Sequence, residues 1–106
     1  MREDRPVVHV IPKHALQEFW RLYPDAEAPL AAWFKLANQA HWQSPADVRA
    51  VYRTVDFVGR LTVFNIGGNK YRLIARVAFE AQRVYVRSVL THAEYDREGW
   101  KNDPWL

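Results

Sequence analysis

Three side chains near the end of the chain have types and spacing that could move protons. In the segment THAEYD, His92 and Tyr95 are three residues apart, and His92 and Asp96 are four apart. On a helical turn these spacings place all three side chains on one face. An imidazole exchanges protons near neutral pH, a phenol donates a proton or positions a phosphate, and a carboxylate orients an imidazole. The segment is a candidate acid–base site, and the alternative is that His92 is an ordinary surface or capping residue.

A second candidate group is cationic and lies on two segments with the period of a β-strand. In KYRLIARVAF, residues 70–79, alternation predicts that one side of a strand carries Tyr71, Leu73, Ala75, Val77 and Phe79 and the other carries Lys70, Arg72, Ile74, Arg76 and Ala78. In RVYVRSVL, residues 83–90, it predicts Val84, Val86, Ser88 and Leu90 on one face and Arg83, Tyr85, Arg87 and Val89 on the other. If the two polar sets lie side by side, one sheet surface carries Lys70, Arg72, Arg76, Tyr85 and Arg87. That surface is either an anion site or the ordinary solvated face of an antiparallel sheet.

The glycines of IGGNK do not form a phosphate-binding loop. Gly67 and Gly68 lack the spacing of the nucleotide-binding motifs, and a strand follows them where those motifs require a helix. We predict a hairpin turn with positive φ angles, which sets the register of the next strand.

Metal binding and cysteine chemistry are not expected. The four histidines are scattered without metal-ligand spacing, and the chain has no cysteine. We therefore expect no metal and no cofactor.

The elements that must position these groups change from helical to β periodicity along the chain. We predict a strand at 6–11, and helices from Lys13 to Tyr23, from an N-cap at Asp25 to about Trp42, and from a cap at Ser44 to about Arg53. Strands follow at 54–58, 61–66, 70–79 and 83–90 in an antiparallel meander, because their connections are too short for parallel crossovers. Thr91 and Glu94 form a capping signature for a short C-terminal helix.

The length and composition bound the class of protein. With 106 residues, of which 49% are hydrophobic and 25% charged, we expect a single domain over 1–106. The net charge of +3 suggests an anionic partner. The N-terminal region has no apolar segment of signal-peptide or membrane-spanning length, so we expect a cytoplasmic protein with no membrane partner.

Four segments, in this order, resemble a known family: HALQEFWRLYPDAEAPLAAWFK, WQSPADV, FNIGGNKYRLIARV and THAEYD. Together they are similar to the HigB family of bacterial toxins, the ribonuclease half of a type II toxin–antitoxin pair in the RelE superfamily. The similarity runs from about Val8 to about Arg97, so 1–6 and 98–106 are expected to be extensions. It implies an α+β, RelE-like fold with a small antiparallel sheet of three to five strands, flanked by two or three helices from the N-terminal half and a short C-terminal helix.

The resemblance also implies a function and roles for residues. The implied activity is metal-independent cleavage of mRNA during translation on the ribosome, and the implied partner is a HigA-type helix-turn-helix antitoxin. Lys70 and Arg72 would contact phosphate, and Arg76 would extend the basic strand. His92 is the first choice for proton transfer, with Tyr95 as its partner or as a base-stacking group and Asp96 as its orienter or as a structural cap.

A non-catalytic RNA-binding or regulatory protein on the same scaffold is the alternative. It is motivated by the altered ending REGWKNDPWL, whose Trp100 and Trp105 could pack on the core, contact the antitoxin or stack on RNA, in that order of expectation.

Overall fold

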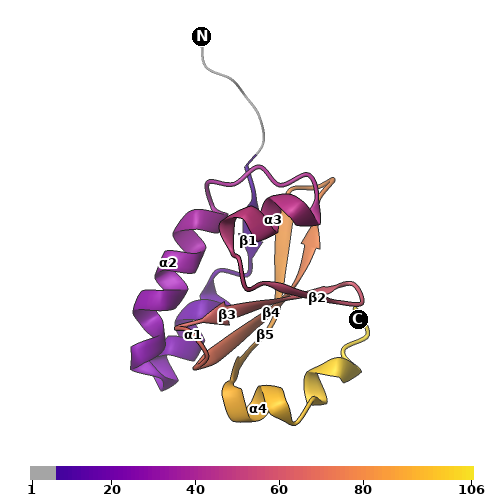
Figure 1. Cartoon of the computed structure of the whole chain (residues 1–106). Coiled ribbons are helices and arrows are strands. Elements are labelled where there is room, and N and C mark those ends of the chain that lie inside the picture. The colour runs from indigo at the N-terminus through magenta and orange to yellow at the C-terminus, as the bar shows by residue number, and fades with distance from the viewer. Residues whose placement is uncertain (1–6) are drawn as a thin grey trace.

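A five-stranded sheet forms the centre of the structure, a computed structural model that describes residues 7–106 (Figure 1). The strands are β1 (His9–Ile11), β2 (Asp56–Val58), β3 (Leu61–Ile66), β4 (Tyr71–Ala78) and β5 (Arg83–Thr91), in the spatial order β1-β5-β4-β3-β2. Strands β2 to β5 form the predicted antiparallel meander, whereas β1 pairs in parallel with β5 at one edge. The predicted extension over 1–6 lies outside the described residues.

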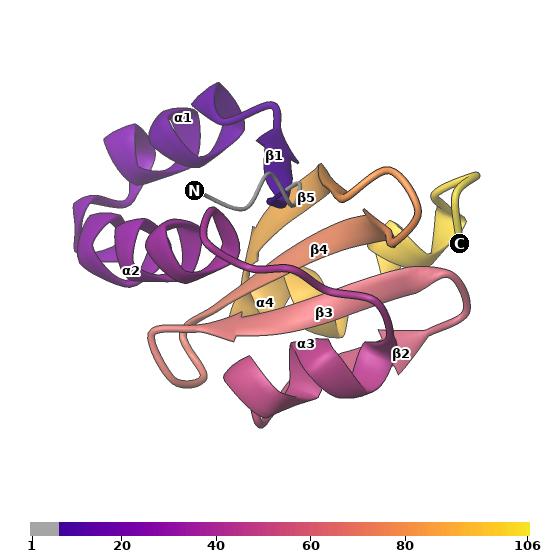
Figure 2. The same ribbon diagram turned by 90° about the horizontal axis from the view of Figure 1, so that it is seen from above.

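Helices occupy the long connection between β1 and β2 and the end of the chain. They are α1 (His14–Leu22), α2 (Glu27–Ala37), α3 (Pro45–Val51) and α4 (His92–Asp96), with 3₁₀ turns η1 (Pro24–Ala26) and η2 (Gly99–Asn102). Figure 2 shows α1 and α2 side by side next to the sheet, with α4 beyond the strands. The α+β prediction, including the short C-terminal helix, is confirmed.

The main core lies between one face of the sheet and the first three helices, because their apolar residues recur at helical spacing and point inward. Its buried members from these helices are Leu16, Phe19, Leu30, Trp33, Ala37 and Val48, and those from the sheet include Phe64, Ile66, Tyr71, Leu73, Ala75, Val77, Val84 and Val86.

The opposite face of the sheet is covered by the C-terminal segment. Trp100 of η2 is buried against Leu61, Val63 and Ile74, and Trp105 packs partly on the same cluster. Packing on the core, the first of the three roles expected for these tryptophans, is confirmed for both.

A β-bulge changes the predicted faces of β5. Ile74 pairs with Ser88 but Ala75 pairs with Val86, so Arg87 is the extra residue. Because one added residue reverses the side-chain alternation, Ser88 and Leu90 do not share a face with Val84 and Val86 as predicted. Leu90 packs on the cluster around Trp100, and Val89 packs on the main core instead.

The turn between β3 and β4 is the predicted hairpin turn. Gly67 and Gly68 have φ angles of +62° and +67°. An L side chain rarely adopts this left-handed conformation, which explains why glycine stands at both positions. The turn sets Asn65 opposite Arg72 in the ladder.

Both predicted ends of the second helix are wrong. The second helix ends at Ala37 rather than near Trp42, and no side-chain hydrogen bond caps it at Asp25, because η1 intervenes. Ser44 is the N-cap residue of α3 and Pro45 its first residue, as predicted, but the Ser44 side chain makes no capping bond; the Asp47 carboxylate accepts a hydrogen bond from the Gln43 backbone N–H at 2.9 Å. The capping box of Thr91 and Glu94 is confirmed.

Asp25 ties the helical layer to the sheet instead of capping a helix. Its carboxylate accepts hydrogen bonds from Lys70 Nζ and from the Tyr71 hydroxyl. These two donors lower the pKa of Asp25, and the same carboxylate raises the pKa of Tyr71 to about 12.

These contacts predict a loss of stability in acid. Because the pKa of Asp25 is lower in the folded than in the unfolded state, its contribution is present above the unfolded value of about 3.8 and is lost as the pH falls through the folded value. We expect Asp25→Asn to lower the Tm at pH 7, and the difference from wild type to shrink below pH about 4. Thermal unfolding followed by circular dichroism between pH 7 and 3 measures this.

Asp56→Asn is the matched control, because the Asp56 side chain makes no hydrogen bond or ion pair within residues 7–106. A Tm difference between wild type and Asp25→Asn that stays constant down to pH 3 would contradict this linkage.

Candidate active site

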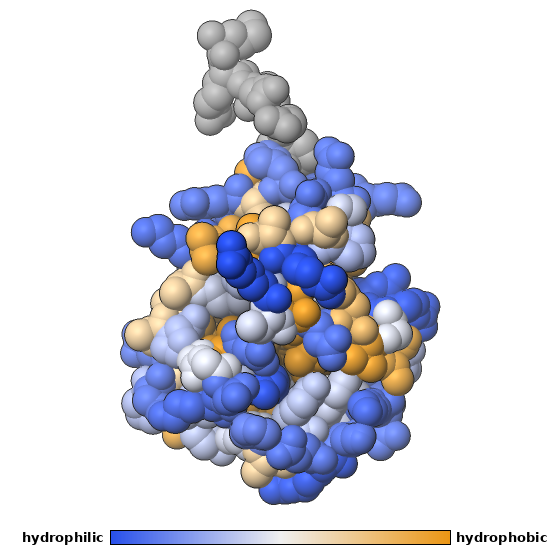
Figure 3. All heavy atoms as spheres, viewed as in Figure 1, coloured by the Kyte–Doolittle hydropathy of each residue, from blue (hydrophilic) through white to orange (hydrophobic). Residues whose placement is uncertain are grey.

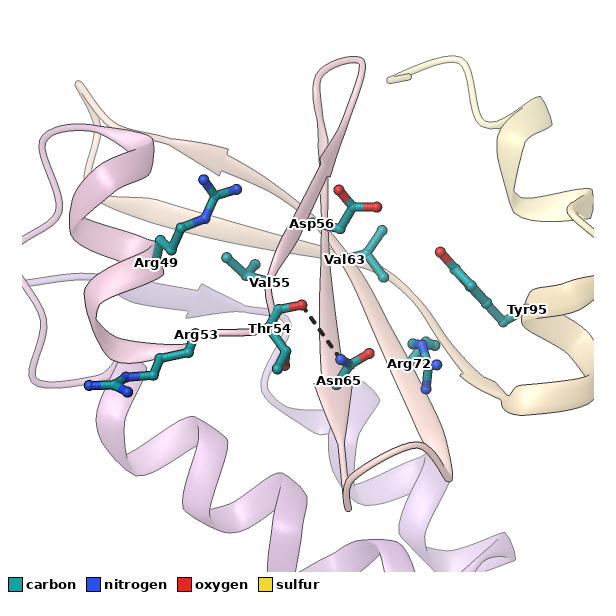
Figure 4. Close-up of a pocket in the computed structure, with 9 residues that line it drawn as sticks. All are labelled: Arg49, Arg53, Thr54, Val55, Asp56, Val63, Asn65, Arg72 and Tyr95. Atoms are coloured by element: carbon teal, nitrogen blue, oxygen red, sulfur yellow. Dashed lines mark hydrogen bonds between the residues drawn. The ribbon is translucent and has the colours of Figure 1, made fainter.

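A cationic groove opens on the face of the sheet opposite α1 and α2. It has a volume of about 480 Å³ and is lined by Arg49, Arg53, Thr54, Val55, Asp56, Val63, Asn65, Arg72 and Tyr95. Figure 4 shows Arg49 and Arg53 on one side, Tyr95 on the other, and Arg72 and Asn65 on the strands between them. In the space-filling view of Figure 3, strongly hydrophilic side chains gather below α3 next to apolar surface. Three arginines around one opening make it suited to an anion.

Three elements position this groove. Asn65 on β3 and Arg72 on β4 are direct ladder partners, so their side chains lie side by side on the sheet surface. Arg49 on α3 and Arg53 just after it are four residues apart and reach the same opening. Tyr95 on α4 closes the other side.

Arg72 is a buried cation in a fixed position. The residue is only 8% exposed. One guanidinium nitrogen donates to the carbonyl oxygens of Asn69 and Tyr71 at 3.1 Å, and the other donates to Asn69 Oδ1 at 3.2 Å. Within residues 7–106 no carboxylate pairs with Arg72. Because an unpaired buried charge is costly, this site favours a bound anion that balances it.

Tyr95 is held by contacts on its ring and its backbone. The ring stacks on Trp100 with centroids 5.2 Å apart and planes 10° apart, and the Arg72 guanidinium carbon lies 5.0 Å from the ring centre. Trp100 Nε1 donates to the Tyr95 carbonyl oxygen at 3.1 Å. The hydroxyl points into the groove in Figure 4. Tyr95 therefore presents a pre-oriented phenol next to a cation.

His92 and Asp96 lie together beside this groove but do not line it. His92 Nδ1 is 3.1 Å from an Asp96 carboxylate oxygen, and both side chains are exposed. The predicted helical face thus brings His92 and Asp96 together, while Tyr95 faces the groove. His92 and Lys70 are close in the backbone, because His92 N–H donates to the Lys70 carbonyl at 3.0 Å. The Lys70 ammonium is paired with Asp25 and does not line the groove.

The other predicted cationic residues lie farther along the same strands. Arg76 and Tyr85 are ladder partners and line a separate pocket. Arg87 is bound to Asp103 at 2.9 Å, and this ion pair lowers the pKa of Asp103. Trp100 packs over Ile74, which lies between Arg72 and Arg76 on the strand. The expected continuous basic surface is therefore divided by an apolar cluster.

Five polar groove residues were not singled out from the sequence: Arg49, Arg53, Thr54, Asp56 and Asn65. Arg49 lies on α3 and Arg53 follows its end, so a spacing of four was the available signal, but Arg53 is not on the helix itself. Asn65 could be found only by pairing β3 with β4 across the glycine turn. Nothing in the sequence distinguishes Asp56 from an ordinary surface carboxylate.

Between residues 7 and 106, no group of three or more His, Cys, Asp or Glu side chains is placed to hold a metal ion. Over the same stretch, no helix has the length and apolar character needed to cross a bilayer.

The sheet, its helices and the covered second face define a small RelE-like α+β domain. The profile of the HigB toxins, described as the RelE-like toxic component of a toxin–antitoxin system, matches residues 26–98. The mRNA interferase toxin HigB of Escherichia coli K12 is 35% identical over 92 residues, which cover 84% of this chain and 88% of the relative, and the mRNA interferase HigB of Shigella flexneri gives the same values. The mRNA interferase HigB of Escherichia coli O6:H1 is 28% identical over 93 residues, covering 85% of this chain and 90% of the relative. The chain belongs to the HigB toxin family.

Proposed function

We propose that this protein is an mRNA interferase, an endoribonuclease whose active site is the groove formed by Arg49, Arg53, Arg72 and Tyr95. The observation that carries the proposal is the buried Arg72 guanidinium, which stacks on Tyr95 and has no carboxylate partner within residues 7–106. The family's toxins include relatives named mRNA interferases, which makes an RNA phosphate the most reasonable anion for this site.

The proposed reaction is attack of a ribose 2′-hydroxyl on the adjacent phosphorus. The 2′-oxygen to phosphorus bond forms and the bond from phosphorus to the 5′-oxygen breaks, which gives a 2′,3′-cyclic phosphate and a 5′-hydroxyl. One group must take the proton of the 2′-hydroxyl, and another must protonate the leaving 5′-oxygen. Negative charge grows on the phosphate oxygens in the transition state, where a fixed cation stabilises it most.

Each groove residue has a role in this proposal. Arg72 binds the scissile phosphate, because its guanidinium is fixed by Asn69 and needs no reorganisation when charge develops. Arg49 and Arg53 bind the neighbouring backbone. The Tyr95 hydroxyl transfers a proton at the scissile group, since it is the only predicted proton-transfer group that lines the groove in the described part of the chain.

The remaining predicted residues support this site. The pair of His92 and Asp96 lies at the rim, where it is a second candidate for proton exchange. Lys70, held by Asp25, fixes the turn that carries Asn69. Arg76, Tyr85 and Arg87 belong to the RNA-facing side farther along β4 and β5.

The proposed partners follow from the family. As the toxic component of a toxin–antitoxin system the protein has an antitoxin, which we expect to be a HigA-type helix-turn-helix protein. We expect the substrate to be mRNA engaged on the ribosome in the cytoplasm, and the cleavage to need no metal.

Induced expression in bacteria tests this function. We expect growth arrest and new 5′-hydroxyl ends in cellular mRNA, with growth restored when a cognate HigA-type antitoxin is co-expressed. Purified protein with translating ribosomes is expected to cleave mRNA equally well with and without EDTA. Salt-sensitive RNA binding without any cleavage would instead favour a non-catalytic RNA-binding protein.

A further inference from the structure

A second pocket lies on the same side of the sheet as the groove. It has a volume of about 450 Å³ and is lined by Arg60, Arg76, Ala78, Tyr85 and Trp105. Arg72 and Arg76 are four residues apart on β4, so both side chains point to one face and their Cα atoms are about 13 Å apart along the strand. The pocket is therefore in reach of the same RNA chain as the groove.

Cationic and aromatic groups meet in this pocket. Within residues 7–106, Arg76 makes no hydrogen bond or ion pair through its side chain. The Tyr85 and Trp105 rings have centroids 5.5 Å apart at an interplanar angle of 81°. Arg60 Nε donates to the Leu106 backbone oxygen at 3.3 Å, which joins the last residues to the β2–β3 turn.

Trp105 is held in place although it is only half-buried. The Arg87 guanidinium carbon lies 4.0 Å from its ring centre, and Arg87 is itself fixed by two hydrogen bonds to Asp103 at 2.9 and 3.1 Å. The Trp105 backbone N–H donates to the same carboxylate at 2.8 Å. Arg87 and Asp103 are thus positioning residues for an aromatic ring that remains partly open to solvent.

An aromatic platform beside cations is the combination that binds single-stranded nucleic acid, since the ring stacks on a base while the cations contact phosphate. The match to the HigB family ends at residue 98, so it includes Tyr85 but not Trp105, the ring on which the base would stack.

We propose that this pocket is a second RNA subsite, in which a base stacks on Trp105 with its edge against Tyr85 while Arg76 and Arg60 contact the adjoining phosphate. The inference rests on the proposed function, because it assumes that RNA enters the neighbouring groove. The subsite extends the length of single-stranded RNA that the toxin holds and adds affinity through a base as well as through the backbone.

Binding of two labelled strands tests this subsite. One is a 2′-O-methylated RNA of about 12 nucleotides, which cannot be cleaved, and the other is an abasic strand of the same length with the same phosphates. Fluorescence anisotropy gives Kd for wild type, Trp105→Leu, Trp105→Phe and Arg76→Gln. Lys35→Gln removes an equal charge from exposed α2 and is the matched control.

We expect Trp105→Leu to weaken binding of the RNA by about ten-fold and of the abasic strand by less than about two-fold, because only the base stacking is lost. Trp105→Phe should restore most of the RNA affinity. Arg76→Gln should weaken both strands and reduce the slope of log Kd against log salt by about 0.7, while Lys35→Gln leaves both strands near wild type.

Two results would overturn the subsite: RNA affinity unchanged by Trp105→Leu, or equal effects of Arg76→Gln and Lys35→Gln. Circular dichroism of each variant confirms folding, and Arg76→Gln provides a test that does not disturb the tryptophan packing. A parallel cleavage assay of wild type separates the two proposals: Trp105-dependent binding without cleavage contradicts the proposed enzyme but supports the subsite, whereas cleavage without Trp105-dependent binding contradicts the subsite alone.

Discussion

Replacing Arg72 with glutamine is expected to lower the rate of mRNA cleavage by about 100-fold or more, equivalent to about 3 kcal/mol of transition-state stabilisation. The guanidinium is buried, is fixed by Asn69 and Tyr71, and has no carboxylate partner within residues 7–106. It is therefore available to a phosphate whose charge grows during the reaction. Growth rate after induction and cleavage by purified protein with ribosomes measure the effect.

Two variants sharpen this test. Arg72→Lys keeps a positive charge but loses the planar donor pair, so we expect a smaller loss than with glutamine. Arg21→Gln removes one charge from the exposed surface of α1, across the sheet from the groove, and should cleave like wild type. If the Arg72→Gln protein folds and cleaves mRNA at the wild-type rate, Arg72 has no role in the reaction.

Replacing Tyr95 with phenylalanine is expected to lower kcat by about 100-fold with little change in KM. Phenylalanine keeps the stacking on Trp100 and the contact with Arg72, so only the hydroxyl that points into the groove is lost. His92→Ala is expected to cost less than about ten-fold, because the imidazole is bound to Asp96 outside the groove. Single-turnover cleavage of an mRNA fragment compares the two.

A larger loss of cleavage in His92→Ala than in Tyr95→Phe would assign proton transfer to His92 instead. If His92→Ala is the more damaging change, and Asp96→Asn shifts the pH profile of cleavage, the pair of His92 and Asp96 is the acid–base group and Tyr95 only stacks. Ala93→Gly serves as a control for any loosening of α4, since Ala93 lies on the same short helix and is exposed.

Predictions from the sequence were correct where a short local pattern of residues determines the structure. Gly67 and Gly68 between two apolar runs predicted a turn with positive φ, and Thr91 with Glu94 predicted a capping box; both are confirmed. Each of these features depends on a few neighbouring residues, so tertiary contacts have little opportunity to override it.

Predictions from the sequence were wrong where contacts between distant segments determine the structure. Asp25 has the type and position of a helix cap, but its carboxylate accepts hydrogen bonds from Lys70, in the turn before β4, and from Tyr71 on β4 instead. The bulge at Arg87 reversed the faces of Ser88 and Leu90, because strict alternation cannot show an inserted residue.

The candidate site was only partly predictable for the same reason. Arg72 and Tyr95 were both named from the sequence, but their stacking depends on how α4 returns over the sheet. Arg49 and Arg53 join them from α3 and the turn that follows it, far from Arg72 and Tyr95 in the chain. Conversely, Lys70 and Arg76 lie near Arg72 in the sequence but not in the groove. Spacing along one strand could not show that Trp100 divides the basic surface.

The most direct test of the groove as the active site is a crystal structure of the Tyr95→Phe variant with a 2′-O-methylated RNA. We predict a phosphate bound to the Arg72 guanidinium, its adjacent 2′-oxygen facing the position of the missing hydroxyl, and Arg49 or Arg53 on a neighbouring phosphate. RNA bound away from Arg72, with the groove between α3 and α4 empty, would contradict the proposed site.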